Sequence, residues 1–131
     1  MATTMLLLDS HTALWLLDDN PRLGPDARHA ISLATRVHVS AATVWELTIK
    51  TMLGRLSVPV DLPARLTEQG LTLLSITAED AEAIRDYPEL NRHDPFDRLL
   101  VAQAARARMR LLTADDVLLN LQRDFILDAR K

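Results

Sequence analysis

The chain has 131 residues, 48% of them hydrophobic, and its 15 basic and 18 acidic side chains give a formal net charge of -3. These values predict one domain with a single core, and they exclude a disordered chain, a fibrous repeat and a protein that coats nucleic acid by charge alone. Because the sequence contains no cysteine, disulfides and thiolate metal sites are excluded, and a metal ion would need oxygen or imidazole ligands.

Short apolar runs alternate with helical patterns along the whole chain. We expect strands at 5–8, 36–39, 71–76, 110–113 and 125–127. We expect helices at 10–17, 26–35, 41–53, 61–70, 77–86, 94–108 and 114–121. This alternation predicts an α/β domain around a mostly parallel sheet.

The ends of several helices carry specific signals. Pro25 suits the first position of the second helix. Ser40 is the expected N-cap of the third helix, and Gly54 the expected stop. Thr77 followed by Asp80 resembles a capping box.

No apolar run approaches the roughly 18 residues that a membrane span needs. The N-terminus has no basic segment of the kind that opens a secretory signal. We therefore expect a soluble, cytoplasmic protein that makes no contact with a membrane.

Acidic residues fall where strands end and where the following helices begin. The residues placed in this way are Asp9, Glu46, Asp97, Asp115 and Asp116. In a parallel sheet the carboxyl ends of the strands share one edge, which is where ligands bind. Clustered carboxylates are costly unless a cation neutralises them, and oxygen ligands without cysteine suit Mg²⁺ or Mn²⁺. Since such an ion can activate water and stabilise charge on a phosphodiester, this pattern predicts a metal-dependent hydrolase.

These acids also have structural interpretations. Asp94, before a proline, fits a helix N-cap, and either acid after the fourth strand could cap the short helix there. Glu46 and Lys50 are four residues apart and could form a solvated helical ion pair worth about 0.2–0.5 kcal/mol. Asp9 is the hardest to explain structurally, because a lone buried carboxylate at a strand end costs several kcal/mol.

Other candidate residues carry weaker signals. The histidines lack metal-ligand spacing, although His93 beside Asp94 could assist chemistry. Trp15 and Trp45 lie within helical apolar patterns and are expected in the core. The three glycines form no phosphate-binding loop, which excludes nucleotide-binding folds of that kind.

Four segments together resemble the motif blocks of PIN-domain proteins, and most closely those of VapC-type toxins from bacterial toxin–antitoxin modules. In chain order the segments are LLLDSHTALWLL, SAATVWELTIK followed by LGRL, HDPFDRLLVAQA and LLTADDVL. The resemblance runs from about Met5 to Leu119, nearly the whole chain. The stretch 1–4 then looks like an N-terminal extension, with initiation at Met5 as an alternative.

The resemblance implies a fold, an activity and partners. The fold is a three-layer α/β/α sandwich around a mostly parallel sheet of about four or five strands, with 1–131 forming a single PIN domain. The activity is that of an endoribonuclease dependent on Mg²⁺ or Mn²⁺. The implied partners are an RNA substrate, a cognate VapB-type antitoxin that covers the acidic groove, and a second copy of the chain in a homodimer. The helices at 61–70 and 77–86 are candidates for the dimer interface.

The resemblance also implies roles for individual residues. The family's four acids fall on Asp9, Glu46, Asp97 and Asp115. Asp94 is expected to support them, and Asp116 is a one-residue alternative to Asp115. Ser10 and Thr113 match small hydroxyl residues that could orient the carboxylates.

We expect Asp9 and Asp97 to hold the metal ion directly, while Glu46 and Asp115 complete the cage or act through water. The basic residues closest in sequence to the acidic blocks could hold the phosphate backbone, with surface ion pairs as the alternative role. They are Arg98, Lys50, Arg92 and Arg55.

Two sequence positions bear on the catalytic role of His93 and on an alternative enzyme class. The family places its histidine directly before an Arg or Lys, whereas the order here is Arg92 then His93, so no catalytic role is assigned to His93. A phosphohydrolase of the haloacid dehalogenase type needs an Asp two residues after the first acid, and His11 stands there. The remaining alternative is a PIN scaffold that binds RNA or an antitoxin and cleaves little or nothing.

Overall fold

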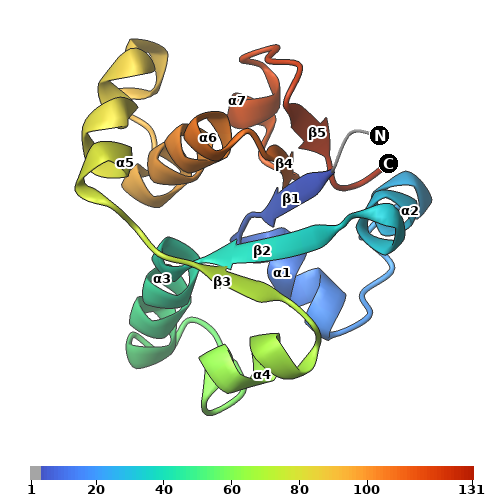
Figure 1. Cartoon of the computed structure of the whole chain (residues 1–131). Helices are drawn as coiled ribbons and strands as arrows, with labels where there is room; N and C mark the ends of the chain where they lie inside the picture. The colour runs from blue at the N-terminus through green and yellow to red at the C-terminus, as the bar shows by residue number, and fades with distance from the viewer. Residues whose placement is uncertain (1–3) are drawn as a thin grey trace.

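The computed structural model describes residues 4–131 and contains a five-stranded, entirely parallel sheet (Figure 1). Its strands are β1 (Met5–Leu8), β2 (Arg36–Ser40), β3 (Thr72–Leu74), β4 (Arg110–Thr113) and β5 (Ile126–Asp128), in the order β3-β2-β1-β4-β5. The predicted parallel α/β fold is confirmed. Of the proposed extension at 1–4, the first three residues lie outside the described part of the chain, whereas Thr4 accepts a backbone hydrogen bond from Thr35.

Seven α-helices and two short 3₁₀ helices surround this sheet in the described part of the chain. The α-helices are α1 (Ser10–Leu17), α2 (Pro25–Leu33), α3 (Ala41–Met52), α4 (Leu62–Glu68), α5 (Ala78–Ala83), α6 (Pro95–Ala107) and α7 (Asp116–Leu119). The helix expected at 77–86 ends in the 3₁₀ helix η1 (Ile84–Asp86), and Pro88 starts a second one, η2 (Pro88–Leu90), where an irregular loop was expected. Within residues 4–131 no helix combines the length and apolar character that crossing a bilayer requires.

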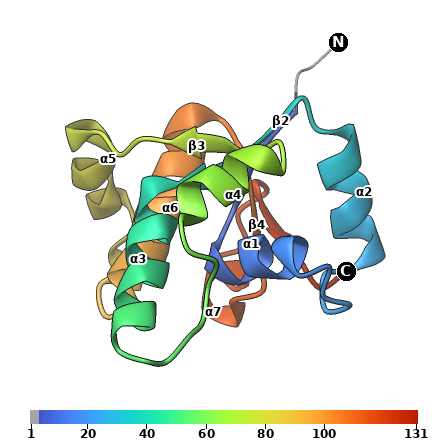
Figure 2. The ribbon, with the colours of Figure 1, turned by 90° about the horizontal axis from the view of Figure 1, so that it is seen from below.

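The pleat of the central strand divides the core into two halves. Leu6 and Leu8 point to the half built with α1, α2 and α4, while Leu7 points to the half built with α6 and α7. Helix α3 contributes Ala42 to one half and Leu47 to the other, because it lies across the end of β2. Figures 1 and 2 show the resulting layers from two directions.

The predicted helix signals are present in the structure. The Ser40 hydroxyl accepts from the Ala42 amide at 3.0 Å, and so caps α3. Thr77 and Asp80 form the capping box of α5, with bonds of 3.0 and 3.1 Å. These caps fix where the helices begin relative to the ends of β2 and β3.

A network of buried polar side chains holds α6 against the carboxyl edge of the sheet. Gln103 of α6 is 1% exposed, and its side-chain oxygen accepts from the Ser40 hydroxyl at 2.6 Å. Its amide nitrogen donates to the Ser75 carbonyl at 3.1 Å and to Asp80 at 3.4 Å. Arg106 also donates to Asp80, at 3.0 Å. Through these bonds α6 is held against the end of β2 and the start of α5.

Within this network, hydrogen bonds offset the effect of burial on the pKa of Asp80. Burial alone would raise the pKa of Asp80, but hydrogen bonds from Thr77, Arg106 and Gln103 favour its carboxylate and hold that pKa below its usual range. The network therefore contains an ionised acid that is fully partnered.

We expect Gln103→Leu to lower the free energy of unfolding by about 1–3 kcal/mol, because it leaves the Ser40 hydroxyl and the Ser75 carbonyl without their partner. Denaturant unfolding measures this change. Gln69→Leu is the matched control, because Gln69 is exposed at the end of α4 and has a φ of -80°. Equal stabilities of the two variants would show that the network does not hold α6 in place.

Candidate active site

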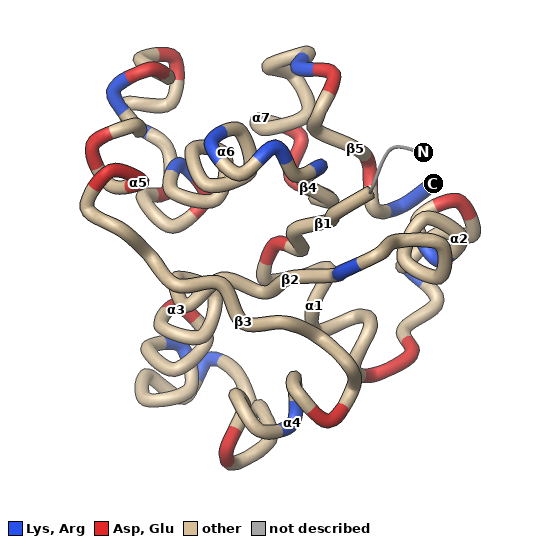
Figure 3. The backbone as a smooth tube through the Cα atoms, viewed as in Figure 1, with Lys and Arg blue, Asp and Glu red and all other residues tan. Residues whose placement is uncertain are grey.

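Carboxylates from four segments that are distant in sequence meet at the carboxyl edge of the sheet. Burial, followed in order of effect by the charges of Asp94, Asp115, Asp9 and Glu46, raises the pKa of Asp97 to about 7. Figure 3 shows acidic segments in red where β1 passes into α1 and on α3. The structure thus brings together the four acids that the sequence singles out.

Asp9 lies between β1 and α1 and is 3% exposed. One carboxylate oxygen accepts from the Thr12 amide at 2.9 Å, which makes Asp9 the N-cap of α1. The other oxygen accepts from the Thr113 hydroxyl at 2.6 Å. Asp9, the acid that was hardest to explain structurally from the sequence, therefore has a structural role as well, because its strand-end position is also a helix start.

Glu46 lies on the second turn of α3 and is 6% exposed. Its carboxylate accepts hydrogen bonds from the Ser10 hydroxyl and from the Lys50 ammonium, the latter at 2.8 Å. The helical ion pair with Lys50 is confirmed, but it is not a solvated surface pair, since the Glu46 side chain is buried. Lys50 thus compensates part of the charge buried at this edge.

Asp97 and Asp115 face each other across His93. The His93 Nε2 atom lies 3.1 Å from an oxygen of Asp97 and 3.3 Å from an oxygen of Asp115. Among residues 4–131, these three side chains form the group whose potential ligand atoms all lie within 4.8 Å of one another. This group differs from the expected pair of Asp9 and Asp97.

The two acids that follow β4 point in different directions. Asp115 caps α7 with one oxygen, which accepts from Val117 at 2.8 Å, and turns the other toward His93. Asp116 is exposed and pairs with Arg130 at 2.9 Å. Geometry therefore favours Asp115 over Asp116 as the fourth acid of the cluster.

The supporting residues contact the acids directly. The Thr113 hydroxyl donates to Asp9 and accepts from the Asp115 amide at 3.0 Å, so it links two of the acidic segments. Ser10 donates to Glu46 in the same way. Asp94 accepts from the amides of Phe96 and Asp97 at 2.8 and 3.3 Å, which confirms its capping role at the start of α6.

The four basic candidates lie in different surroundings. Lys50 pairs with Glu46, and Arg55 is exposed and lines the same hollow as Lys50. The Arg98 guanidinium makes a 3.4 Å contact with the Asn91 carbonyl, and its buried Nε lacks a hydrogen-bond partner among the described residues. Arg92 is exposed on the loop before α6.

Sequence reasoning undervalued His93, which the structure places between two of the acids. Its position four residues before Asp97 was the available signal, because that spacing puts two side chains on one face of a helical turn. The contact with Asp115 has no signal in the sequence, since it joins two separate segments of the chain.

The donor set fits a hard divalent cation. Carboxylate oxygens with one imidazole are ligands that Mg²⁺ and Mn²⁺ accept, and buried like charges need a cation to neutralise them. The raised pKa of Asp97 is the physical sign of that need. Asp97, Asp115 and Asp9, with His93 or Glu46 alongside, are the residues that could hold such an ion.

The chain is similar to known proteins along most of its length. The model of the PIN domain family matches residues 6–123. Ribonuclease VapC22 from Mycobacterium tuberculosis is 31% identical over 114 residues, which cover 86% of this chain and 88% of that protein.

Solved structures share the fold at low sequence identity. The structure of VapBC-1 from nontypeable Haemophilus influenzae superposes with a TM-score of 0.71 at 17% identity and covers 98% of this chain and 100% of that chain. VapBC2 from Rickettsia felis, bound to a DNA fragment from its promoter, has a TM-score of 0.66 at 10% identity, with 95% and 98% of the two chains covered. Fold, acidic cluster and family match together show that the chain belongs to the PIN-domain family.

Proposed function

We propose that this protein is a metal-dependent endoribonuclease of the VapC type, the toxin of a toxin–antitoxin pair. The observation that carries the proposal is the convergence of Asp9, Glu46, Asp97 and Asp115 at one edge of the sheet, where burial and the neighbouring carboxylates together raise the pKa of Asp97 to about 7. The similarity to a ribonuclease over most of both chains supports RNA as the substrate. Its place of action is then the cytoplasm.

Each residue of the cluster has a distinct task in this proposal. Asp97 and Asp115 hold the cation with Asp9, whose orientation is fixed by Thr12 and Thr113. A bound Mg²⁺ or Mn²⁺ supplies Lewis-acid stabilisation of the phosphodiester and lowers the pKa of a water. Glu46 lies beside this centre, and Ser10 and Lys50 set its orientation.

The basic residues near the cluster would bind the RNA backbone. Lys50 pairs with Glu46 and lines one hollow with Arg55, and Arg92 and Arg98 lie on the segment that carries Asp97.

We also propose two protein partners. Solved structures with this fold include VapBC complexes, which supports a VapB-type antitoxin that binds over the acidic edge. A second copy of the chain would cover an apolar hollow of about 170 Å³ beside α3, α5 and α6. There Trp45, which is 58% exposed and not in the expected core position, meets Phe96 edge to face.

A scaffold that only binds RNA or an antitoxin is the competing interpretation. It leaves unexplained why buried like charges are retained at a cost in stability. Cleavage by the purified protein distinguishes the two.

We expect Asp97→Asn to reduce cleavage of a small-RNA pool with Mg²⁺ by at least about 100-fold, because loss of a metal ligand removes several kcal/mol of transition-state stabilisation. Asp116→Asn is the matched control and should cleave like the wild type, since Asp116 pairs with Arg130. Full activity of Asp97→Asn at saturating Mg²⁺ would refute the metal assignment.

The raised pKa of Asp97 also predicts how stability depends on pH in EDTA. The folded protein retains a proton on Asp97 that the unfolded chain has released, so this contribution to stability is present at low pH and is lost as the pH rises toward about 7. In thermal unfolding between about pH 5 and about pH 8, the melting temperature of Asp97→Asn should therefore rise relative to that of the wild type as the pH increases.

Added Mg²⁺ should cancel most of this difference at the higher pH, because the ion stabilises the folded wild type with Asp97 ionised. A gap between wild type and Asp97→Asn that does not change with pH or with Mg²⁺ would contradict the assignment.

A further inference from the structure

A second hollow, of about 280 Å³, adjoins the acidic cluster between α1 and the end of α3. Three leucines line it, Leu14, Leu47 and Leu56, together with Lys50 and Arg55. Leu47 is buried, whereas both basic side chains are more exposed, so apolar surface lies deeper than positive charge. Figure 3 shows basic segments in blue toward the end of α3.

The end of α3 holds the two cations next to each other. Gly54 has φ 73°, a left-handed conformation that glycine adopts without strain, and its amide donates to the Thr51 carbonyl at 3.0 Å. The Arg55 amide donates to the Lys50 carbonyl at 3.0 Å, which completes a Schellman motif. The backbones of Lys50 and Arg55 are thus joined directly.

The hollow and the acidic cluster share one wall. Ser10 and Lys50 both line the hollow, and both donate hydrogen bonds to Glu46. If an anionic polymer had one of its phosphates at the carboxylates, the next unit of that polymer would therefore lie beside Lys50 and Arg55. Since Lys50 is already paired with Glu46, Arg55 is the cation left for that phosphate.

We propose that this hollow binds a nucleotide of the RNA next to the bond that is cleaved. Arg55, with help from Lys50, holds the phosphate, and the base lies against the leucines. His11, which is exposed and lines the hollow, adds an aromatic surface. This inference rests on the proposed ribonuclease function, and it assigns the site that selects the nucleotide.

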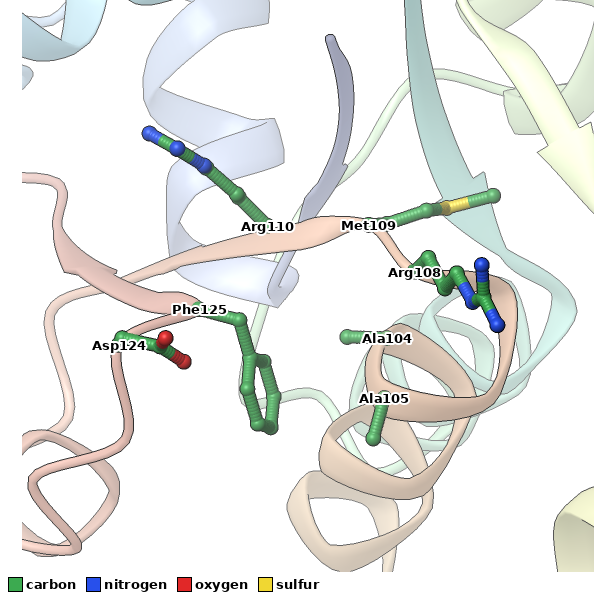
Figure 4. Close-up of a pocket in the computed structure, with 7 residues that line it drawn as sticks. All are labelled: Ala104, Ala105, Arg108, Met109, Arg110, Asp124 and Phe125. Atoms are coloured by element: carbon green, nitrogen blue, oxygen red, sulfur yellow. The ribbon is translucent and has the colours of Figure 1, made fainter. Parts of the chain in front are cut away.

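A larger hollow elsewhere in the described part of the chain is also lined by basic residues, but it lacks a neighbouring acidic cluster. It has a volume of about 330 Å³ and is lined by Arg108, Arg110, Asp124 and Phe125 with parts of α6 (Figure 4). Arg110 starts β4, so this hollow lies at the opposite edge of the sheet from the carboxylates. It offers positive charge without an adjoining acidic cluster.

Binding of a short fluorescent single-stranded RNA of mixed sequence, measured by anisotropy in EDTA, tests the phosphate contact without cleavage. Arg55→Glu should weaken binding about tenfold and reduce the slope of log K against log salt by about 0.7 or more. Arg110→Glu, which makes the same change of charge at the other hollow, should stay within about twofold of the wild type. Equal effects of the two variants, or a larger effect of Arg110→Glu, would overturn the proposal.

A second measurement separates a nucleotide site from a phosphate site. In ¹⁵N–¹H spectra of the full chain, nucleoside monophosphates should shift the amides of His11, Arg55 and Leu56. Inorganic phosphate should shift Arg55 alone. Identical shifts with phosphate and with every nucleotide would refute base binding.

Failure of this inference and failure of the nuclease proposal give different results. If Arg55→Glu binds and cleaves RNA like the wild type, the hollow is not the nucleotide site while the nuclease assignment stands. If Arg55→Glu loses affinity only for an antitoxin, the hollow belongs to that partner and the proposal is wrong. If the wild type binds RNA through Arg55 but never cleaves it, the nuclease assignment fails, and with it the claim that the hollow adjoins a cleaved bond, while the hollow remains a nucleotide site.

Discussion

Repulsion between buried carboxylates is the constraint on which this structure depends. Burial, together with the charges of Asp94, Asp115, Asp9 and Glu46, raises the pKa of Asp97 to about 7. Hydrogen bonds offset part of the cost: Thr12 and Thr113 bind Asp9, and Ser10 and Lys50 bind Glu46. Asp97 has His93 at 3.1 Å, but its pKa stays raised, and a divalent cation would neutralise the charge that is left uncompensated.

The fold and the list of acids could be predicted from the sequence because both depend on local patterns. Apolar runs, Ser40, Gly54 and the pair Thr77–Asp80 mark where elements begin and end. A parallel sheet then brings the strand ends to one edge without further information. The capping role of Asp9 was not recognised from the sequence, although its bond to Thr12 follows from a helix that starts at the next residue.

Side-chain contacts between distant segments could not be predicted. His93 meets Asp115, Gln103 meets Ser40, and neither pair has a spacing that a sequence displays. Trp45 was expected in the core because its helical pattern does not show which face stays uncovered. Tertiary packing decides all three.

Glu46 links the two parts of the proposed site, since it belongs to the acidic cluster and accepts hydrogen bonds from Ser10 and Lys50, which line the hollow. The central claim is nevertheless the cation at Asp97, and calorimetric titration of Mn²⁺ into the wild type, Asp97→Asn and Asp116→Asn at about pH 7 tests it most directly. The account predicts saturable binding to the wild type and Asp116→Asn, none to Asp97→Asn, and a heat that varies with the buffer because Asp97 releases its proton. Equal affinity of Asp97→Asn and the wild type for Mn²⁺ would contradict it.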